Sequence, residues 1–259
     1  MLAAVLVGDD PASQVYVRNK IQACAKAGIE SRLEAIPARV SELELAACLA
    51  ALNADPTVDG ILLQLPLPKH LEARRAVETI APAKDVDGLH SANLGKLVAD
   101  DDSGFVPCTP AGVVWMLREC GVDVAGQQVL VIGRSTLVGR PLALLFLRRG
   151  HGGNATVTIA HTQTRDLPAL VRTADVVVAA AGVPEFVHGD WLRPGVVVVD
   201  VGIHRRPGAD GKSRLVGDVH FASAVEVAGA ITPVPGGVGP MTVAMLLRNT
   251  LLAWQRREA

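Results

Sequence analysis

Tyr16 and Lys20 are residues whose types and spacing could support chemistry. They stand four positions apart in a stretch with a helical pattern, so both side chains are expected on one helical face. Tyr16 is the only tyrosine in the chain. Its ring could stack on a flat ligand while the neighbouring amine delivers a proton. Taken alone, the spacing favours a simpler interpretation, a packed tyrosine beside a solvated lysine.

Three further features are expected at the same edge of a sheet as this pair. Gln64 ends an apolar, strand-like run, and Pro66 and Pro68 stop that strand because proline cannot donate to a β-ladder. The other two features are an acidic loop at 84–88 and a glycine- and proline-rich run at 232–242. The prolines hold Gln64 in place, which distinguishes it from an ordinary exposed glutamine.

A glycine-containing turn at 133–141 follows the strand-like run at 128–132. Glycines let the backbone approach a pyrophosphate, and the N-terminus of the helix beyond offers unpaired N–H groups and a positive dipole end. The spacing differs from the common Gly-x-Gly-x-x-Gly pattern, so a purely structural turn between strand and helix remains an alternative.

Charge at the end of the next strand indicates which dinucleotide would bind. An NAD enzyme normally places a carboxylate there to bind the ribose hydroxyls. Here the chain reads Ala-His-Thr-Gln-Thr at 160–164, and the first acid is Asp166, whereas Arg134 lies in the turn. A 2′-phosphate would therefore meet donors, which favours NADP over NAD. His161 alone could equally be a surface histidine.

The elements that must position these residues follow an α/β pattern. Hydrophobic residues make up 49% of the 259 residues and aromatic residues only 3%, so aliphatic side chains must build the cores. Apolar runs of strand length alternate with helical patterns, as in a parallel sheet. A first block is predicted to hold strands at 3–7, 31–36 and 60–65 and helices at 13–27, 41–53 and about 73–80, with a capping box formed by Ser41 and Glu44.

A second block begins after Cys108 and is predicted to be a Rossmann-like, doubly wound parallel sheet. Its last helix has no strand left to follow and is expected to pack back on the first block. The predicted helices at the two ends of this block are 110–120 and 242–257, and the predicted strands are 128–132, 156–160, 175–179, 196–201 and 230–232.

Charge and cysteine usage exclude several classes of protein. The formal net charge is −1 and basic residues are scattered, which argues against a nucleic acid or an anionic membrane as partner and favours a small molecule. The sequence has no Cys-x-x-Cys and no His-x-x-x-His, so neither a disulfide framework nor a metal site is expected. The apolar start is too short for a signal peptide, which predicts a cytoplasmic protein.

Together these motifs resemble the bifunctional methylenetetrahydrofolate dehydrogenase/cyclohydrolase family. Their order and spacing agree over nearly the whole chain, so a chance match is improbable. The motifs are Tyr-x-x-x-Lys at 16–20, Gln-Leu-Pro-Leu-Pro at 64–68, Lys-Asp-Val-Asp-Gly at 84–88, Pro-Cys-Thr-Pro at 107–110 and Ile-Thr-Pro-Val-Pro-Gly-Gly-Val-Gly-Pro-Met-Thr at 231–242.

The resemblance implies two consecutive reactions, in which NADP oxidises 5,10-methylenetetrahydrofolate and water then opens the methenyl product to 10-formyltetrahydrofolate. It implies that Lys20 is the main acid/base residue of the hydrolytic step and that Gln64 orients it. Tyr16 would stack on the aminobenzoate part, and Asp87 would accept hydrogen bonds from the amino-pterin edge. Further substrate contacts are expected from Leu63, Leu65, Pro235, Gly236, Gly237, Val238 and Gly239.

The same resemblance implies the cofactor contacts and the roles of the blocks. Residues 1–108 with 242–259 would form a folate-binding catalytic domain, and 109–241 an NADP-binding domain through which a homodimer forms. The cofactor contacts are expected at Gly133, Arg134 and Ser135, at His161 and Thr162 near the 2′-phosphate, and at Ile203 near the nicotinamide.

One departure and two alternatives remain. Family members usually carry a further segment with an amphipathic helix before the first strand. Without this segment we expect exposed apolar surface and lower stability. The melting temperature of an upstream-extended version would test this expectation.

A dehydrogenase without cyclohydrolase activity would use the same Lys20 and Gln64. A folate- or nucleotide-binding module without turnover is a third possibility, although it would have little use for a proton-transfer lysine.

Overall fold

The computed structural model describes residues 1–207 and 213–258. Their contacts divide the chain into two units. Unit 1 comprises Met1–Cys108 and Val243–Ala259, and unit 2 comprises Thr109–Thr242.

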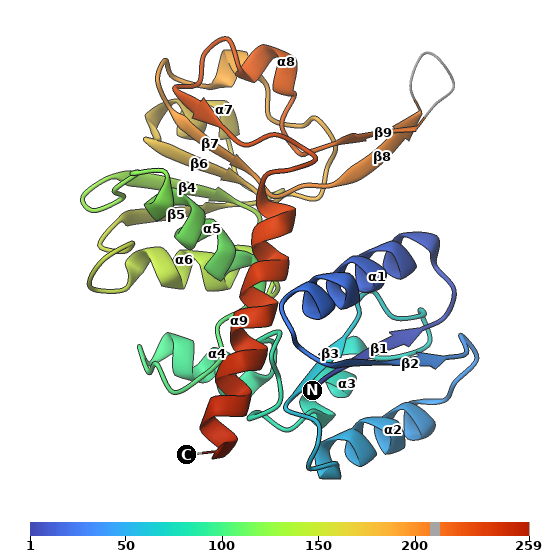
Figure 1. Ribbon diagram of the computed structural model, residues 1–259. Helices are drawn as coiled ribbons and strands as arrows, with labels where there is room; N and C mark the ends of the chain where they lie inside the picture. The colour runs from blue at the N-terminus through green and yellow to red at the C-terminus, as the bar shows by residue number, and fades with distance from the viewer. Residues whose placement is uncertain (208–212, 259) are drawn as a thin grey trace. The chain divides into compact units, whose positions relative to one another are not determined.

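Unit 1 is built on a three-stranded parallel sheet in the order β2-β1-β3. Its strands are β1 (Leu2–Val7), β2 (Ser31–Ile36) and β3 (Gly60–Leu63), and every residue of β1 is buried. Helix α1 (Pro11–Lys26) and helix α2 (Glu42–Ala54) lie on opposite sides of this sheet (Figure 1). Because both faces are covered, the central strand is continuously apolar instead of alternating.

Local signals in the sequence explain where these two helices begin. Asp10 caps α1 by accepting a hydrogen bond from the Ser13 N–H at 2.8 Å. The predicted capping box is confirmed, since the Glu44 N–H donates to Ser41 Oγ and the Ser41 N–H donates to the Glu44 carboxylate. Strand β3 ends at Leu63, two residues earlier than predicted, although the Gln64 N–H still donates to the Val5 carbonyl at 2.9 Å.

Unit 1 is completed by α3 (Ala73–Thr79), α4 (Ser91–Val98) and the C-terminal part of α9 (Val238–Glu258). Helix α4 was not predicted. The predicted packing of the last helix on the first block is confirmed, because buried Asn249 donates to the carbonyls of Val86 and Val106. The helix begins at Val238 and not at 242, because Pro240 lies in the first turn, where a helix needs no N–H at that position.

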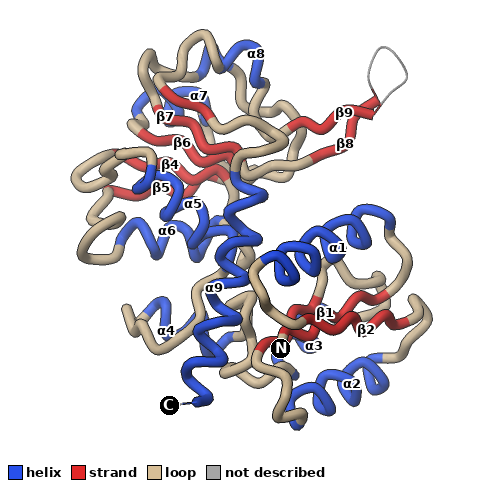
Figure 2. Tube along the Cα trace, in the orientation of Figure 1, coloured by secondary structure: helices blue, strands red, loops and turns tan. Residues whose placement is uncertain are grey.

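Unit 2 contains a five-stranded parallel sheet in the order β10-β7-β6-β4-β5, which confirms the doubly wound prediction (Figure 2). Alternate residues of its strands enter two cores, with Leu130 and Ile132 in one and Val129 and Val131 in the other. Helices therefore cover both faces. The strands are β4 (Gln128–Ile132), β5 (Thr156–Ala160), β6 (Val176–Ala179), β7 (Val197–Asp200) and β10 (Ala230–Ile231); the helices are α5 (Cys108–Glu119), α6 (Gly139–Leu147), α7 (Leu167–Thr173), η1 (Gly189–Trp191) and α8 (Phe221–Ala224).

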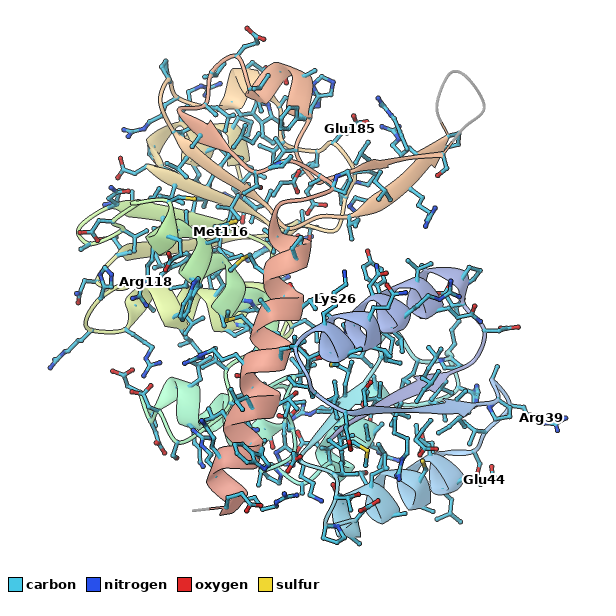
Figure 3. The ribbon with its side chains drawn as sticks, in the orientation of Figure 1. Lys26, Arg39, Glu44, Met116, Arg118 and Glu185 are labelled. Carbon is cyan, nitrogen blue, oxygen red and sulfur yellow. The ribbon has the colours of Figure 1, made fainter. Side chains whose placement is uncertain are left out.

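An antiparallel pair of strands, β8 (His204–Pro207) and β9 (Ser213–Val216), extends from unit 2 and was not predicted. Glu185, labelled beside this pair in Figure 3, forms ion pairs with Arg206 of β8 and Arg214 of β9. These pairs attach the two strands to the loop that follows β6.

Candidate active site

Lys20 and Gln64 form the centre of the candidate site in unit 1. Lys20 Nζ donates to Gln64 Oε1 at 3.1 Å, which joins α1 to the end of β3. Gln64 is only 8% exposed, and its amide nitrogen donates to the Leu65 carbonyl at 2.6 Å. Since each end of the amide has its own partner, the carbonyl oxygen is directed at the lysine. The two residues that the sequence places 44 positions apart thus meet as one pair.

Tyr16 lies one helical turn before Lys20 and is 38% exposed. Tyrosine rings are usually more buried than this in a packed helix face, and an exposed ring beside an amine can stack on a planar ligand. The residues on either side of Gln64 differ: Leu63 is buried in the core of unit 1, whereas Leu65 is only partly buried.

The acidic loop contains two aspartates with different surroundings. Asp85 is 1% exposed, and its carboxylate accepts hydrogen bonds from the His90 N–H and from Asn93 Nδ2, both at 2.8 Å. Burial raises the pKa of Asp85, and these hydrogen bonds oppose that effect. Asp85 therefore holds the loop in shape. Asp87 is only half-buried, so its carboxylate is the one available to a ligand.

Cys108 also belongs to this site, although its residue type and spacing alone did not indicate a role. It is buried, and its Sγ donates to the Val86 carbonyl at 3.3 Å. Burial raises the pKa of the Cys108 thiol well above its ordinary value, and the nearby Asp87 carboxylate raises it further while Lys20 opposes the shift. Asp87 and Lys20 are thus both close enough to act on the same thiol. The Pro-Cys-Thr-Pro motif was the signal that could have singled out this cysteine.

The turn after β4 in unit 2 depends on two glycines. Gly133 has φ +130°, and a Cβ atom on it would lie 2.1 Å from the Ala180 carbonyl oxygen. A Cβ on Gly139 would lie 2.1 Å from the Gly133 carbonyl oxygen. Between them Arg134 and Ser135 are exposed, and α6 begins at Gly139. The turn therefore presents a tightly folded backbone and a helix N-terminus, as a phosphate site requires.

The end of β5 lies next to this turn, because β5 pairs with β4 in the sheet. His161 is half-buried and its Nδ1 accepts a hydrogen bond from the Gln163 N–H at 3.2 Å, while Thr162 is exposed. Asp166, the first acid after this strand, caps α7 by accepting from the Ala169 N–H. Its carboxylate therefore caps the N-terminus of α7. The residues directly at the end of β5 are neutral or basic.

The remaining predicted residues of unit 2 are placed in two segments. Ile203 follows β7 and is 44% exposed, which is high for an isoleucine. In the run Pro235, Gly236, Gly237, Val238 and Gly239, the first residue follows a cis peptide bond and the last two already belong to α9. The Val238 side chain packs in the core beneath the sheet, so at this position only the backbone could face a ligand.

No group of three or more His, Cys, Asp or Glu side chains suited to a metal ion occurs within residues 1–207 and 213–258. Over the same residues no helix has the length and apolar character needed to cross a bilayer.

The fold and the two groups of residues define a two-unit α/β protein with a dinucleotide-type sheet and a separate lysine–amide site. Comparison with known families matches both parts of the chain to domains of one family. Residues 1–87 match the catalytic domain of the tetrahydrofolate dehydrogenase/cyclohydrolases, and residues 107–258 match their NAD(P)-binding domain. The chain belongs to the tetrahydrofolate dehydrogenase/cyclohydrolase family, as the motifs had indicated.

Individual relatives agree with this assignment. The chain is 59% identical over 257 residues to the bifunctional protein FolD 3 of Rhizorhabdus wittichii, covering 99% of this chain and 83% of that protein. The methylenetetrahydrofolate dehydrogenase/cyclohydrolase of Campylobacter jejuni has a similar structure, with a TM-score of 0.92 and 44% identity over 99% of this chain and 88% of that chain. The Trypanosoma brucei enzyme, solved with NADP and an inhibitor, gives a TM-score of 0.92 and 40% identity over 98% and 86%.

Proposed function

We propose that this chain oxidises 5,10-methylenetetrahydrofolate with NADP and then hydrolyses the 5,10-methenyl product to 10-formyltetrahydrofolate. The observation that carries the proposal is the hydrogen bond of 3.1 Å between Lys20 Nζ and Gln64 Oε1. This hydrogen bond brings the Lys20 amine, a group that can transfer protons, to the end of β3, in a chain that belongs to a family of dehydrogenases and cyclohydrolases.

In the oxidation, NADP when bound accepts a hydride from the methylene carbon, and a methenyl cation is left on the folate. In the hydrolysis, a water oxygen adds to that carbon and loses a proton, and one carbon–nitrogen bond of the bridge then breaks as its nitrogen gains a proton. Lys20 is the residue we assign to these proton transfers. Gln64 keeps the amine directed at the reacting carbon, because its own amide is held by Leu65.

The other substrate contacts follow from exposure and charge. The exposed ring of Tyr16 would stack on the aminobenzoate, which is flat and apolar. The half-buried carboxylate of Asp87 would accept hydrogen bonds from the amino-pterin edge, whose N–H groups are donors. We assign this chemistry to unit 1.

We assign the NADP site to unit 2, with the phosphates at Gly133, Arg134 and Ser135. Three observations favour NADP over NAD. Arg134 is exposed in the phosphate turn, the end of β5 carries His161 and Thr162, and the Asp166 carboxylate is used as a helix cap. A 2′-phosphate would find donors and a cation here. The Trypanosoma brucei relative was crystallised with NADP.

We further propose a cytoplasmic location and a homodimer formed through unit 2. Both proposals rest on the family resemblance. The location is also consistent with the family's substrates, which are small, soluble molecules. Sedimentation of the purified chain would test the second point, and a species with the mass of one chain across micromolar concentrations would refute it.

The proposed function is tested by following NADPH formation by absorbance with methylenetetrahydrofolate, with NAD in parallel. Formation of 10-formyltetrahydrofolate from added methenyltetrahydrofolate is measured separately. Both activities, with faster turnover on NADP than on NAD, are expected. Oxidation without 10-formyl product would identify a dehydrogenase alone, and binding of both ligands without turnover would identify a binding module; either result overturns the proposal.

A further inference from the structure

One buried carboxylate joins the ends of two neighbouring strands in unit 2. Asp218 is 0% exposed. Its Oδ2 accepts a hydrogen bond from the Gly182 N–H at 2.8 Å, and its Oδ1 lies 2.7 Å from His204 Nε2. In this pair Nε2 can be the donor and the carboxylate oxygen the acceptor. Gly182 lies in the segment after β6 and His204 in the segment after β7, so Asp218 links the segments that follow the carboxyl ends of both strands.

A second carboxylate fixes the position of the first. Asp200 is 4% exposed; its Oδ1 accepts from the N–H groups of Gly202 and Asp218 at 3.0 and 2.8 Å, and its Oδ2 accepts from the Val219 N–H at 2.9 Å. Burial raises the pKa of Asp200 to about 6, and the three donors oppose the shift. Asp200 therefore holds the backbone on both sides of the link formed by Asp218.

Two glycines make room for these carboxylates. A Cβ atom on Gly202 would lie 2.2 Å from Asp218 Oδ1, and a Cβ on Gly217 would lie 1.8 Å from Asp200 Oδ2. No other residue fits at either position without moving the carboxylate. The close packing of both carboxylates therefore requires glycine at positions 202 and 217.

The linked segments carry unusual surface residues. Val183 follows Gly182 and Ile203 follows Gly202, and each is 44% exposed. In a doubly wound sheet the dinucleotide lies across the carboxyl ends of the strands, with its pyrophosphate at the first turn. Here that turn follows β4, and β5, with His161 and Thr162, lies on one side of it. The other half of the ligand must then extend toward β6 and β7, where two exposed aliphatic side chains suit a flat ring.

We propose that Asp218, completed by His204, is a positioning residue for the nicotinamide half of the dinucleotide. Its two oxygens fix the spacing between the Gly182–Val183 and Gly202–Ile203 segments, and this spacing sets the surface against which the ring rests. The inference rests on the proposed use of a nicotinamide dinucleotide in unit 2. According to this inference, His204 and Asp218 affect how the nicotinamide half of the ligand binds and do not affect the adenosine half.

His204→Ala is the variant of choice, because His204 is only partly buried and lies in a short strand. It leaves one oxygen of a buried carboxylate without its donor, so the segment after β7 loses a constraint. His204→Gln restores an N–H donor of similar reach. His188→Ala is the matched control, an exposed histidine of the same unit.

The measurement is calorimetric binding of NADP and of 2′-phospho-ADP-ribose, which keeps the phosphorylated adenosine half and lacks the nicotinamide. His204→Ala is expected to weaken NADP about 10-fold, as one hydrogen bond to a charged group would. Its affinity for 2′-phospho-ADP-ribose and its cyclohydrolase rate should stay within about twofold of the unsubstituted chain. His204→Gln should recover most of the NADP affinity, and His188→Ala should match the unsubstituted chain for both ligands.

Two results would overturn the inference and leave the proposed function intact: unchanged NADP affinity in His204→Ala, or equal losses for NADP and 2′-phospho-ADP-ribose. Failure of the unsubstituted chain to bind either ligand would instead refute the dinucleotide site itself. Under saturating NADP, His204→Ala should also show a lower kcat for oxidation while its cyclohydrolase rate is kept, whereas a general loss of folding would lower both rates together.

Discussion

The two units present their site residues in different ways. In unit 1 the reactive groups are side chains, with an amine on α1 and a carboxamide at the end of β3 that meet at 3.1 Å. In unit 2 the groups that would hold phosphate are mostly backbone N–H groups, exposed by glycines that leave no room for a Cβ atom. Substitutions in unit 1 should therefore remove chemistry, whereas substitutions in unit 2 should change geometry.

The units also share one device. Each contains a buried aspartate whose carboxylate accepts hydrogen bonds from a loop, Asp85 in unit 1 and Asp200 in unit 2. Burial raises the pKa of both carboxyl groups. In each case the structural aspartate lies within three residues of a predicted ligand contact, Asp87 or Ile203. A rigid loop supports the site in both units, even though the ligand-facing groups differ.

Lys20→Met should give the largest effect. We expect the hydrolytic step to fall by about 100-fold or more, because a general acid–base group is lost, while NADP affinity stays unchanged. Conversion of methenyltetrahydrofolate and calorimetric NADP binding check the two parts. Lys26→Met is the control, since Lys26 is an exposed lysine in the last turn of the same helix (Figure 3). Full hydrolytic activity in Lys20→Met would remove the assigned role.

Gly133→Ala tests the backbone half of the comparison. The new Cβ would lie 2.1 Å from the Ala180 carbonyl oxygen at φ +130°, so the turn must move. We expect NADP affinity to fall about 10- to 100-fold with cyclohydrolase activity largely kept. Gly95→Ala is the control, because a Cβ there meets nothing within 4 Å. Normal NADP binding by Gly133→Ala would contradict the assignment of this turn to phosphate.

Asp200→Asn tests the role of the buried aspartate through the pH dependence of stability. Because burial raises the pKa of Asp200 from 3.8 to about 6, the folded protein keeps this proton over a range in which the unfolded chain has lost it. The contribution of Asp200 to the free energy of unfolding therefore falls by about 2–3 kcal/mol as the pH rises from about 4 to 6. Above that range Asp200 is ionised in both states, and its contribution no longer changes with pH.

The asparagine variant cannot titrate and should lack this fall. Urea unfolding of both proteins at about pH 4, 5, 6 and 7 measures the difference in their free energies of unfolding. A difference that is constant with pH would show that Asp200 does not titrate in this range. Asp85→Asn should likewise remove a fall in the free energy of unfolding with rising pH, because burial also raises the pKa of Asp85.

Arg134→Ala should have the smallest effect of the four and a selective one. Loss of one charge-assisted contact to the 2′-phosphate should weaken NADP by about 1–3 kcal/mol and leave NAD almost unchanged. Arg149→Ala, an exposed arginine beyond the C-terminal end of α6, is the control. Equal weakening of NADP and NAD would place the 2′-phosphate elsewhere.

Regular elements could be predicted because their signals are local, whereas the pairing of Lys20 with Gln64, 44 positions away, was implied by the family resemblance. Helical spacing, a capping box and a proline-stopped strand each involve residues a few positions apart. Most strands were located within two residues of their observed ends. The same holds for the turn after β4, whose glycines are contiguous with the strand.

Other features had a weak local signal or none. Pro-Gly at 207–208 and Asp-Gly at 210–211 are turn dipeptides, but the flanking β8 and β9 segments are mostly charged or polar and lack the apolar alternation that predicts strands. Their attachment depends on ion pairs to Glu185, which precedes both strands. The Asp218 link joins residues 36 and 14 positions apart, and aspartates in loops are usually solvated. Only the folded sheet brings these groups together.

The last helix, α9, gives the chain a particular order of assembly during synthesis. Asn249 donates to the carbonyls of Val86 and Val106, at the two ends of the segment 86–106. The ribosome makes Val86 and Val106 before unit 2 and Asn249 after it, so unit 1 obtains these bonds only when α9 has been synthesised. A nascent chain stalled before α9 should therefore expose unit 1 in an unfinished form, after most of unit 2 has emerged.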